Sequence, residues 1–184
     1  MFAPSALDIQ KALERLAGGL GRYQWLQAMV SECNVTTDGE FQRRFTVFYR
    51  VRRSSEWRAA FFALMEKSKS SGINFLDALR AIRLSTGRIE ASFASKLVAT
   101  LDPSKPVVDK FVLQCFQLRL PNWGLADREV KTVELYRQLC LRYDGFMTSA
   151  NGVKIRNMFD EKYPNATITD IKKIDLVLWQ IRPD

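Results

Sequence analysis

The chain has 184 residues, of which 47% are hydrophobic and 11% aromatic, so it is long enough to bury a substantial core. It carries 28 Lys and Arg against 20 Asp and Glu, and the net charge of +8 favours a polyanionic partner. Because histidine is absent, Ser-His and Cys-His nucleophile pairs are excluded. The three cysteines lie far apart and suggest neither a zinc site nor a disulfide framework, so no metal or other cofactor is expected.

Neither a membrane span nor a secretion signal is indicated by the sequence. There is no run of about 18 apolar residues. The N-terminus also lacks a charged start followed by an apolar segment. We therefore expect a cytoplasmic protein.

Helix-like spacing of apolar residues runs through the first third of the chain. Within 5–32 a Gly-rich break at 18–21 interrupts this spacing, so two short helices are predicted. The segment "EFQRRFTVFY" favours a helix, although 45–51 also alternates with period two and leaves a strand open. Ser54 or Ser55 is suited to cap the next helix, which ends before Gly72.

The rest of the chain also has the pattern of helices and loops. Helices are predicted over about 74–83 and, before "DPSKP", from the spacing of Ile89, Phe93, Leu97, Val98 and Leu101. Asp109 lies at the expected N-cap of another, and "LPNWG", a helix over 127–143 and a last helix "IKKIDLVLWQI" follow. The predicted fold class is all-α. The chain is either one helical domain of residues 1–184 or two lobes of about 1–83 and 84–184 that share a cleft.

Six arginines lie within sixteen residues that contain one acid, Glu56; they are Arg43, Arg44, Arg50, Arg52, Arg53 and Arg58. Two interpretations stay open, a phosphate-binding patch and a solvated helical face. Aromatic residues among the arginines favour nucleic acid, because rings stack on bases while guanidinium groups bind phosphate. Tyr49 and Trp57, with Trp123 further along, are therefore candidate base-stacking residues, unless they belong to the core.

The stretch "LSTGRIEASFASKLVATLDPSKPVVDKFVL" resembles part of the helix-hairpin-helix DNA glycosylase superfamily, over about residues 84–116. The resemblance implies a compact multi-helix fold, a hairpin at "LSTG" and duplex DNA as the partner. It also places Asp109 at the superfamily's catalytic aspartate, whereas the residues alone allow a plain N-cap. The candidate nucleic-acid-binding residues are Arg50, Arg52, Arg53, Thr86, Gly87, Arg88, Lys96 and Lys110.

Two departures from the family pattern shape the expected activity. The hairpin usually carries two glycines so that backbone amides approach a phosphate, and here Gly87 alone is present, so the hairpin is degenerate. Thr86 and Arg88 would partly substitute through a hydroxyl and a charge. Strand-cleaving members carry a lysine near the position of Glu90, so the resemblance implies a monofunctional enzyme without lyase activity.

A second resemblance covers most of the chain. The segments "FYRVRR", "EWR", "TGRIEASFASK", "DKFVL" and "ITDIKKIDLVLWQ" are similar to motifs of a group of uncharacterised bacterial proteins, which implies a bacterial or phage origin. The function expected is DNA repair, by hydrolytic removal of a damaged or modified base. The alternatives are a catalytically inactive DNA-binding or damage-sensing protein and a bacterial defence or regulatory interaction module.

Overall fold

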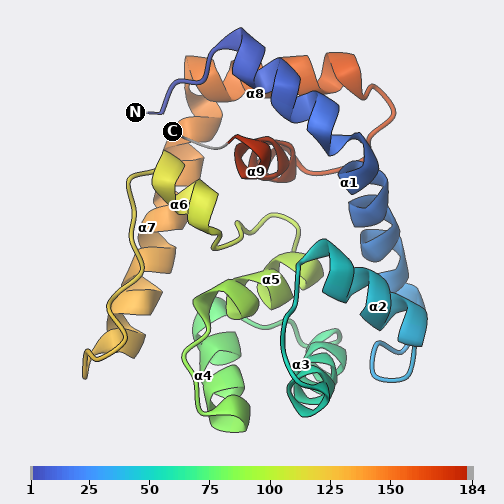
Figure 1. Cartoon of the computed structure of the whole chain (residues 1–184), viewed down its shortest axis with the longest axis vertical. Helices are drawn as coiled ribbons and strands as arrows, with labels where there is room; N and C mark the ends of the chain where they lie inside the picture. The colour runs from blue at the N-terminus through green and yellow to red at the C-terminus, as the bar shows by residue number, and fades with distance from the viewer. Residues whose placement is uncertain (1, 182–184) are drawn as a thin grey trace. The chain divides into compact units, whose positions relative to one another are not determined.

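The computed structural model describes residues 2–181, which form nine α-helices and no strand (Figure 1). The all-α class predicted from the sequence is confirmed. Within this part of the chain no helix has the length and apolar character needed to span a bilayer. The helices are α1 (Ala6–Glu32), α2 (Gly39–Phe48), α3 (Ser55–Ser68), α4 (Phe75–Thr86), α5 (Ala91–Leu101), α6 (Lys110–Cys115), α7 (Arg128–Thr148), α8 (Ala150–Lys162) and α9 (Asp170–Gln180).

The chain divides into two units, each with a core of its own. Unit 1 holds the residues up to Ala17 and those from Pro103 onward, and unit 2 holds residues 18–102. These bounds differ from the predicted lobes of 1–83 and 84–184. The predicted boundary falls inside α4, and α4 packs against α5, so the two helices belong to one unit.

α1 is one continuous helix of 27 residues, so the prediction of two short helices is wrong. Gly18 and Gly21 lie inside it, and each costs only about 1 kcal/mol relative to alanine in a helix interior. Leu16, Leu20 and Tyr23 are buried on either side of these glycines. Burying such side chains contributes more than the glycines cost, so the helix continues.

An aromatic cluster forms the core of unit 2. The ring of Phe45 in α2 lies 5.6 Å from Phe61 and 5.5 Å from Phe62 in α3. Trp57 stacks on Phe61 at 5.1 Å and lies 4.6 Å from Phe93 in α5. Because α2 continues through Phe48, the helical interpretation of this segment is confirmed. The cluster fixes both the loop between α2 and α3 and the segment that leads into α5.

Local signals set the ends of the helices that meet near this cluster. α3 begins after Ser54, whose side chain accepts the backbone N–H of Trp57, as predicted. α4 ends at Gly87, whose φ of 72° is a left-handed conformation that favours glycine. Four residues later α5 begins, and α4 and α5 lie side by side (Figure 1). The segment predicted as a hairpin is therefore a short turn between two packed helices.

In unit 1, α9 packs against α6, α7 and α8 (Figure 1). The ring of Phe116 lies 5.0 Å from Tyr143 and 5.6 Å from Phe146 in the same core. α7 is longer than predicted, and α8 was not predicted from the sequence. Ser149 separates the two helices and caps α8 by accepting the N–H of Gly152.

Gly152 lies where α7 meets α8, and we predict that the stability of the protein depends on a glycine at this position. A Cβ at this position would lie against the Phe146 carbonyl oxygen and 2.9 Å from its carbonyl carbon. Because backbone atoms cannot move aside cheaply, Gly152→Ala should destabilise the protein by about 3 kcal/mol or more in urea unfolding. The matched control is Gly145→Ala in α7, where nothing lies within 4 Å, and it should be neutral or stabilising. Equal effects of the two changes would contradict this packing.

Candidate nucleic-acid interface

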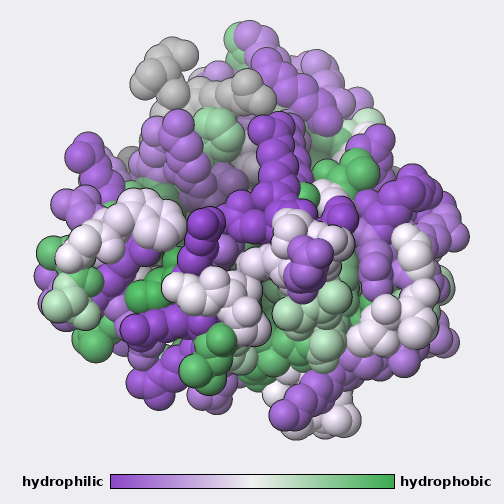
Figure 2. All heavy atoms as spheres, turned by 60° about the horizontal axis from the view of Figure 1, so that its bottom comes forward, coloured by the Kyte–Doolittle hydropathy of each residue, from purple (hydrophilic) through white to green (hydrophobic). Residues whose placement is uncertain are grey.

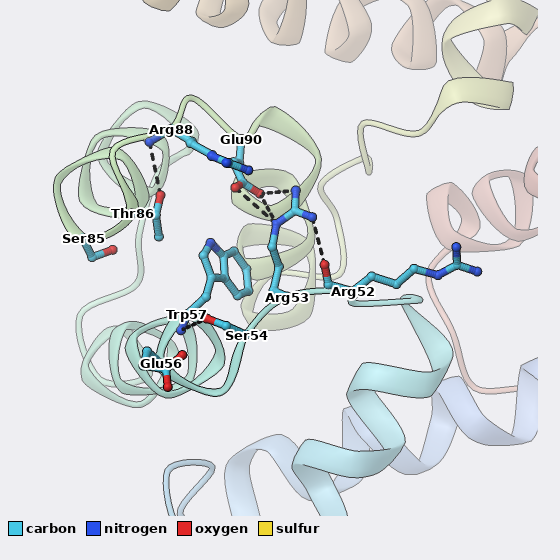
Figure 3. A pocket seen from close by; sticks show the side chains of 9 residues that line it. All are labelled: Arg52, Arg53, Ser54, Glu56, Trp57, Ser85, Thr86, Arg88 and Glu90. Carbon is cyan, nitrogen blue, oxygen red and sulfur yellow. Dashed lines mark hydrogen bonds and ion pairs between the residues drawn. The ribbon is translucent and has the colours of Figure 1, made fainter.

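A pocket of about 500 Å³ lies in unit 2 between the start of α3 and the α4–α5 turn (Figure 3). It brings together several of the residues predicted to bind nucleic acid, from segments that are distant in the sequence. Three arginines against two glutamates leave the lining with a net charge of +1. The lining residues are Arg52, Arg53, Ser54, Glu56, Trp57, Ser85, Thr86, Arg88 and Glu90.

The α4–α5 turn forms one wall of the pocket. The Thr86 hydroxyl donates to the Ile82 carbonyl at 2.7 Å and accepts the N–H of Arg88 at 3.3 Å, so it closes the turn internally. Gly87 is exposed, and its N–H donates to the Arg83 carbonyl at 2.8 Å, so this amide closes the end of α4. Arg88 is exposed. The turn therefore presents one guanidinium group beside an exposed glycine.

Arg53 and Glu90 form an ion pair in which the carboxylate is buried and the arginine side chain is partly exposed. The Arg53 Nη2 lies 3.0 Å from Glu90 Oε2, and Nε donates to both carboxylate oxygens at 3.2 and 3.3 Å. The Glu90 side chain is 3% exposed and that of Arg53 is 34% exposed. The guanidinium carbon also lies 5.0 Å from the centre of the Phe93 ring. The pair joins the loop before α3 to the start of α5, so Arg53 has a structural role.

The other arginines of the group point elsewhere. The side chain of Arg52 extends away from the rest of the lining, and its carbonyl accepts from Arg53 Nη1 at 3.0 Å (Figure 3). Arg50 is exposed in the turn after α2, with a φ of 52°. The neighbouring residues Arg50, Arg52 and Arg53 thus do not act as one group. Figure 2 shows one face of the molecule, where hydrophilic residues (purple) are interspersed with apolar ones.

Tyr49 and Trp57, both candidates for base stacking, are core residues in unit 2. Tyr49 lies 4.7 Å from Phe45 and 4.8 Å from Phe48, and Lys96 Nζ donates to its carbonyl at 3.3 Å. Trp57 is 8% exposed and packs against the Phe61 and Phe93 rings described above. Its indole N–H is buried and has no hydrogen-bond partner within residues 2–181. Trp57 therefore contributes a packed ring to the pocket wall and not an open stacking face.

Asp109 belongs to unit 1 and is the N-cap of α6, as predicted. Its Oδ1 accepts the N–H of Phe111 at 2.8 Å, and the residue is half-buried. The three residues before it, Pro106, Val107 and Val108, are buried, which explains an aspartate beside an apolar run. Lys110, the first residue of α6, is exposed.

A group of buried polar side chains shares the core with Asp109. The Tyr143 hydroxyl donates to Asp175 at 2.9 Å, and Asp175 also pairs with buried Lys172 at 2.8 Å. Burial, followed by the charge of Asp175, holds the pKa of Tyr143 well above its usual range. Burial raises the pKa of the Cys115 thiol to about 12. The charge of Asp109 contributes to both shifts, so its carboxylate lies near a desolvated cluster.

Trp123 is the exposed member of the candidate stacking residues. It lies in the loop between α6 and α7 and is 73% exposed. The guanidinium carbon of Arg128 stands 3.7 Å from the centre of its ring. One ring face is therefore covered and the remainder of the side chain is accessible to solvent.

Two residues of importance were missed from the sequence. Glu90 was noted for its position in the family pattern but not as the partner of Arg53, which lies 37 residues away. Arg128 was not singled out, because a lone arginine at a helix start gives no local signal of burial.

Comparisons with protein-family models, with curated proteins and with solved structures gave no match. The resemblance of residues 84–116 to DNA glycosylases therefore rests on its sequence motifs.

Proposed function

We propose that the protein binds DNA through the pocket of unit 2 and removes a damaged or modified base as a monofunctional DNA N-glycosylase. The observation that carries the proposal is the α4–α5 turn, where exposed Arg88 adjoins exposed Gly87. A turn of this kind between two packed helices is the element that the superfamily resemblance implies. The chain's surplus of positive charge supports the same partner.

The pocket supplies donors suited to a phosphate group. Arg88 offers a charge-assisted fork, and the Ser54 hydroxyl is a further donor in the lining. Glu90 neutralises Arg53, so the positive charge of the pocket lining comes from Arg52 and Arg88. Contacts of this kind position a protein on DNA without reading its sequence.

The proposed chemistry needs one carboxylate. As the bond between C1′ and the base breaks, positive charge develops on the sugar, and a carboxylate nearby stabilises it and orients water. The water oxygen then bonds to C1′ and a water proton is released, while the base takes the bonding electrons. The cap to Phe111 holds Asp109 at a fixed place, as this role requires.

Strand cleavage is not part of the proposal. Glu90 stands where strand-cleaving members of the resembled family carry a lysine, and it is buried against Arg53. Lys96 lies further along α5, where its Nζ donates to the carbonyl of Tyr49. Neither residue offers an amine at that position, so the sugar product should remain in an intact strand.

A catalytically inactive DNA-binding protein is the second candidate. The hydrogen bond from Phe111 to Asp109 favours it, because helix capping accounts for this aspartate without any chemistry. The two candidates share the interface of unit 2 and differ in the role of Asp109.

The interface predicts a specific change in the salt dependence of DNA binding. Changing Arg52 and Arg88 together to alanine should flatten the slope of log affinity for duplex DNA against log salt by roughly 1.8, about 0.9 for each phosphate that is no longer neutralised. The melting temperature should not change, because both residues are exposed. Affinity is measured by fluorescence anisotropy between 50 and ~200 mM salt.

Arg53→Ala is the matched control for this measurement. It leaves the Glu90 carboxylate buried without its partner, so it should lower stability by about 1–3 kcal/mol, a range discounted for the partial exposure of Arg53. An unchanged salt slope in the Arg52/Arg88 variant, with duplex binding retained, would remove the pocket from the DNA interface.

Asp109→Asn separates catalysis from capping. Asparagine caps helices as well as aspartate, so fold and DNA affinity should be kept. Base release should fall at least about 100-fold because the charge that stabilises the sugar is lost. The assay uses a panel of duplexes that each contain one deaminated, oxidised or alkylated base.

The control is the same change at another helix cap. Asp38 caps α2 by accepting the N–H of Phe41 at 2.8 Å, and Asp38→Asn should leave base release unaltered. Full turnover in the Asp109→Asn variant would exclude Asp109 as the catalytic group. Tight duplex binding by the unchanged protein with no base released from the whole panel would favour the inactive candidate.

A further inference from the structure

Arg128 is a buried cation at the start of α7. It is 8% exposed, and its Nε is buried without a hydrogen-bond partner within residues 2–181. The preceding acid, Asp127, pairs instead with Lys131 at 3.0 Å. A guanidinium removed from water without a carboxylate or phosphate is costly. The contact that Arg128 does make is with the ring of Trp123.

The position of Arg128 in its helix adds to this cost. It is the first residue of α7, a helix of 21 residues, where the helix dipole is positive and disfavours a cation. The N-cap, Asp127, makes no side-chain hydrogen bond to the first turn. One anion placed here would neutralise the guanidinium and interact favourably with the helix terminus.

Trp123 supplies an aromatic surface beside this cation. The guanidinium group covers one face of the ring, and with 73% of the side chain exposed the other face is accessible. An indole with an open face is a stacking platform for any nucleobase. The ligand that has both an anionic group and a flat base is a nucleotide.

We infer that Trp123 and Arg128 form a second nucleotide-binding site, in which an unpaired base stacks on Trp123 and its phosphate binds Arg128. The inference rests on the proposed DNA-binding function and extends it, because the unit 2 pocket takes phosphate without a base. Free nucleotides share this chemistry with a nucleic-acid strand. Since the proposed substrate is DNA, a strand with an unpaired base is the expected source.

The test compares variants of the full chain on three probes. These are a single-stranded oligonucleotide containing 2-aminopurine, a fully paired duplex, and a free nucleoside 5′-monophosphate. Trp123→Ala should weaken binding of the single strand about tenfold and abolish the quenching of 2-aminopurine that stacking produces. Trp123→Phe should keep most of both. Leu141→Ala, which removes an exposed apolar side chain on α7, is the matched control and should change neither.

Arg128→Met tests the phosphate contact. Because no ion pair is broken, the melting temperature should stay constant or rise. The salt slope for the single strand should flatten by about 0.7. If this variant does not fold, the Trp123 variants still decide the question, because an exposed side chain can be truncated without leaving a cavity.

The outcomes separate this site from the proposed function. If the unchanged protein binds duplex and loses that binding in the Arg52/Arg88 variant, while Trp123→Ala alters neither affinity nor quenching, this inference is overturned and the proposed function stands. If Trp123→Ala weakens binding of the single strand but the Arg52/Arg88 change does not alter duplex binding, this inference stands and the proposed function is overturned. Equal affinity for the monophosphate would support the site and make free nucleotides its ligand. Loss of self-association in Trp123→Ala with unaltered affinity would make this patch a protein interface and overturn the inference.

Discussion

The ion pair between Arg53 and Glu90 is the interaction on which the candidate interface depends. It connects the loop before α3 to the residue before α5, and the aromatic contacts of Trp57 and Phe93 lie beside it. The pocket therefore has walls held in place by an interaction between residues 37 positions apart. This pairing also explains how a dense run of arginines is divided. Arg53 pairs with a buried acid, while the side chain of Arg52 extends away from the rest of the lining.

The two units carry different parts of the proposed activity. Unit 2 holds the turn and the basic pocket, which are suited to phosphate, whereas unit 1 holds Asp109 and the buried group around Tyr143. The proposal therefore assigns phosphate binding to unit 2 and the catalytic carboxylate to unit 1. The Trp123 site would give unit 1 its own contact with an unpaired base, which is the form of base that such chemistry needs.

The helices and their caps were largely predictable because their signals are local. Asp109 and the pair Ser54 or Ser55 were identified as N-caps from residue type and position alone, and Asp109 and Ser54 make the expected hydrogen bonds. The continuity of α1 was not predictable in this way, because burial of Leu20 and Tyr23 decides it against the glycines. α8 was missed because its apolar residues are few, and its start depends on the close approach of Gly152 to α7.

The candidate site was less predictable than the fold. Residue type indicated the arginines and the turn, but long-range contacts determine which of them are available. Glu90 neutralises Arg53, and packing against Phe61 and Phe93 turns Trp57 from a stacking candidate into a core residue. Arg128 gives the opposite case, since only the fold reveals that a common surface residue is buried, with an Nε that has no hydrogen-bond partner in the described part of the chain.

The central claim is that DNA phosphate binds at the pocket of unit 2, and the indole resonance of Trp57, in the pocket wall, reports on it. The four tryptophans give four indole resonances in a ¹⁵N-labelled sample, which single substitutions assign. Titration with an unmodified duplex should shift the Trp57 indole resonance together with the backbone amides of Gly87 and Arg88. The account would be contradicted if the duplex binds and the shifts are confined to other residues, or if none of these three resonances moves at saturation.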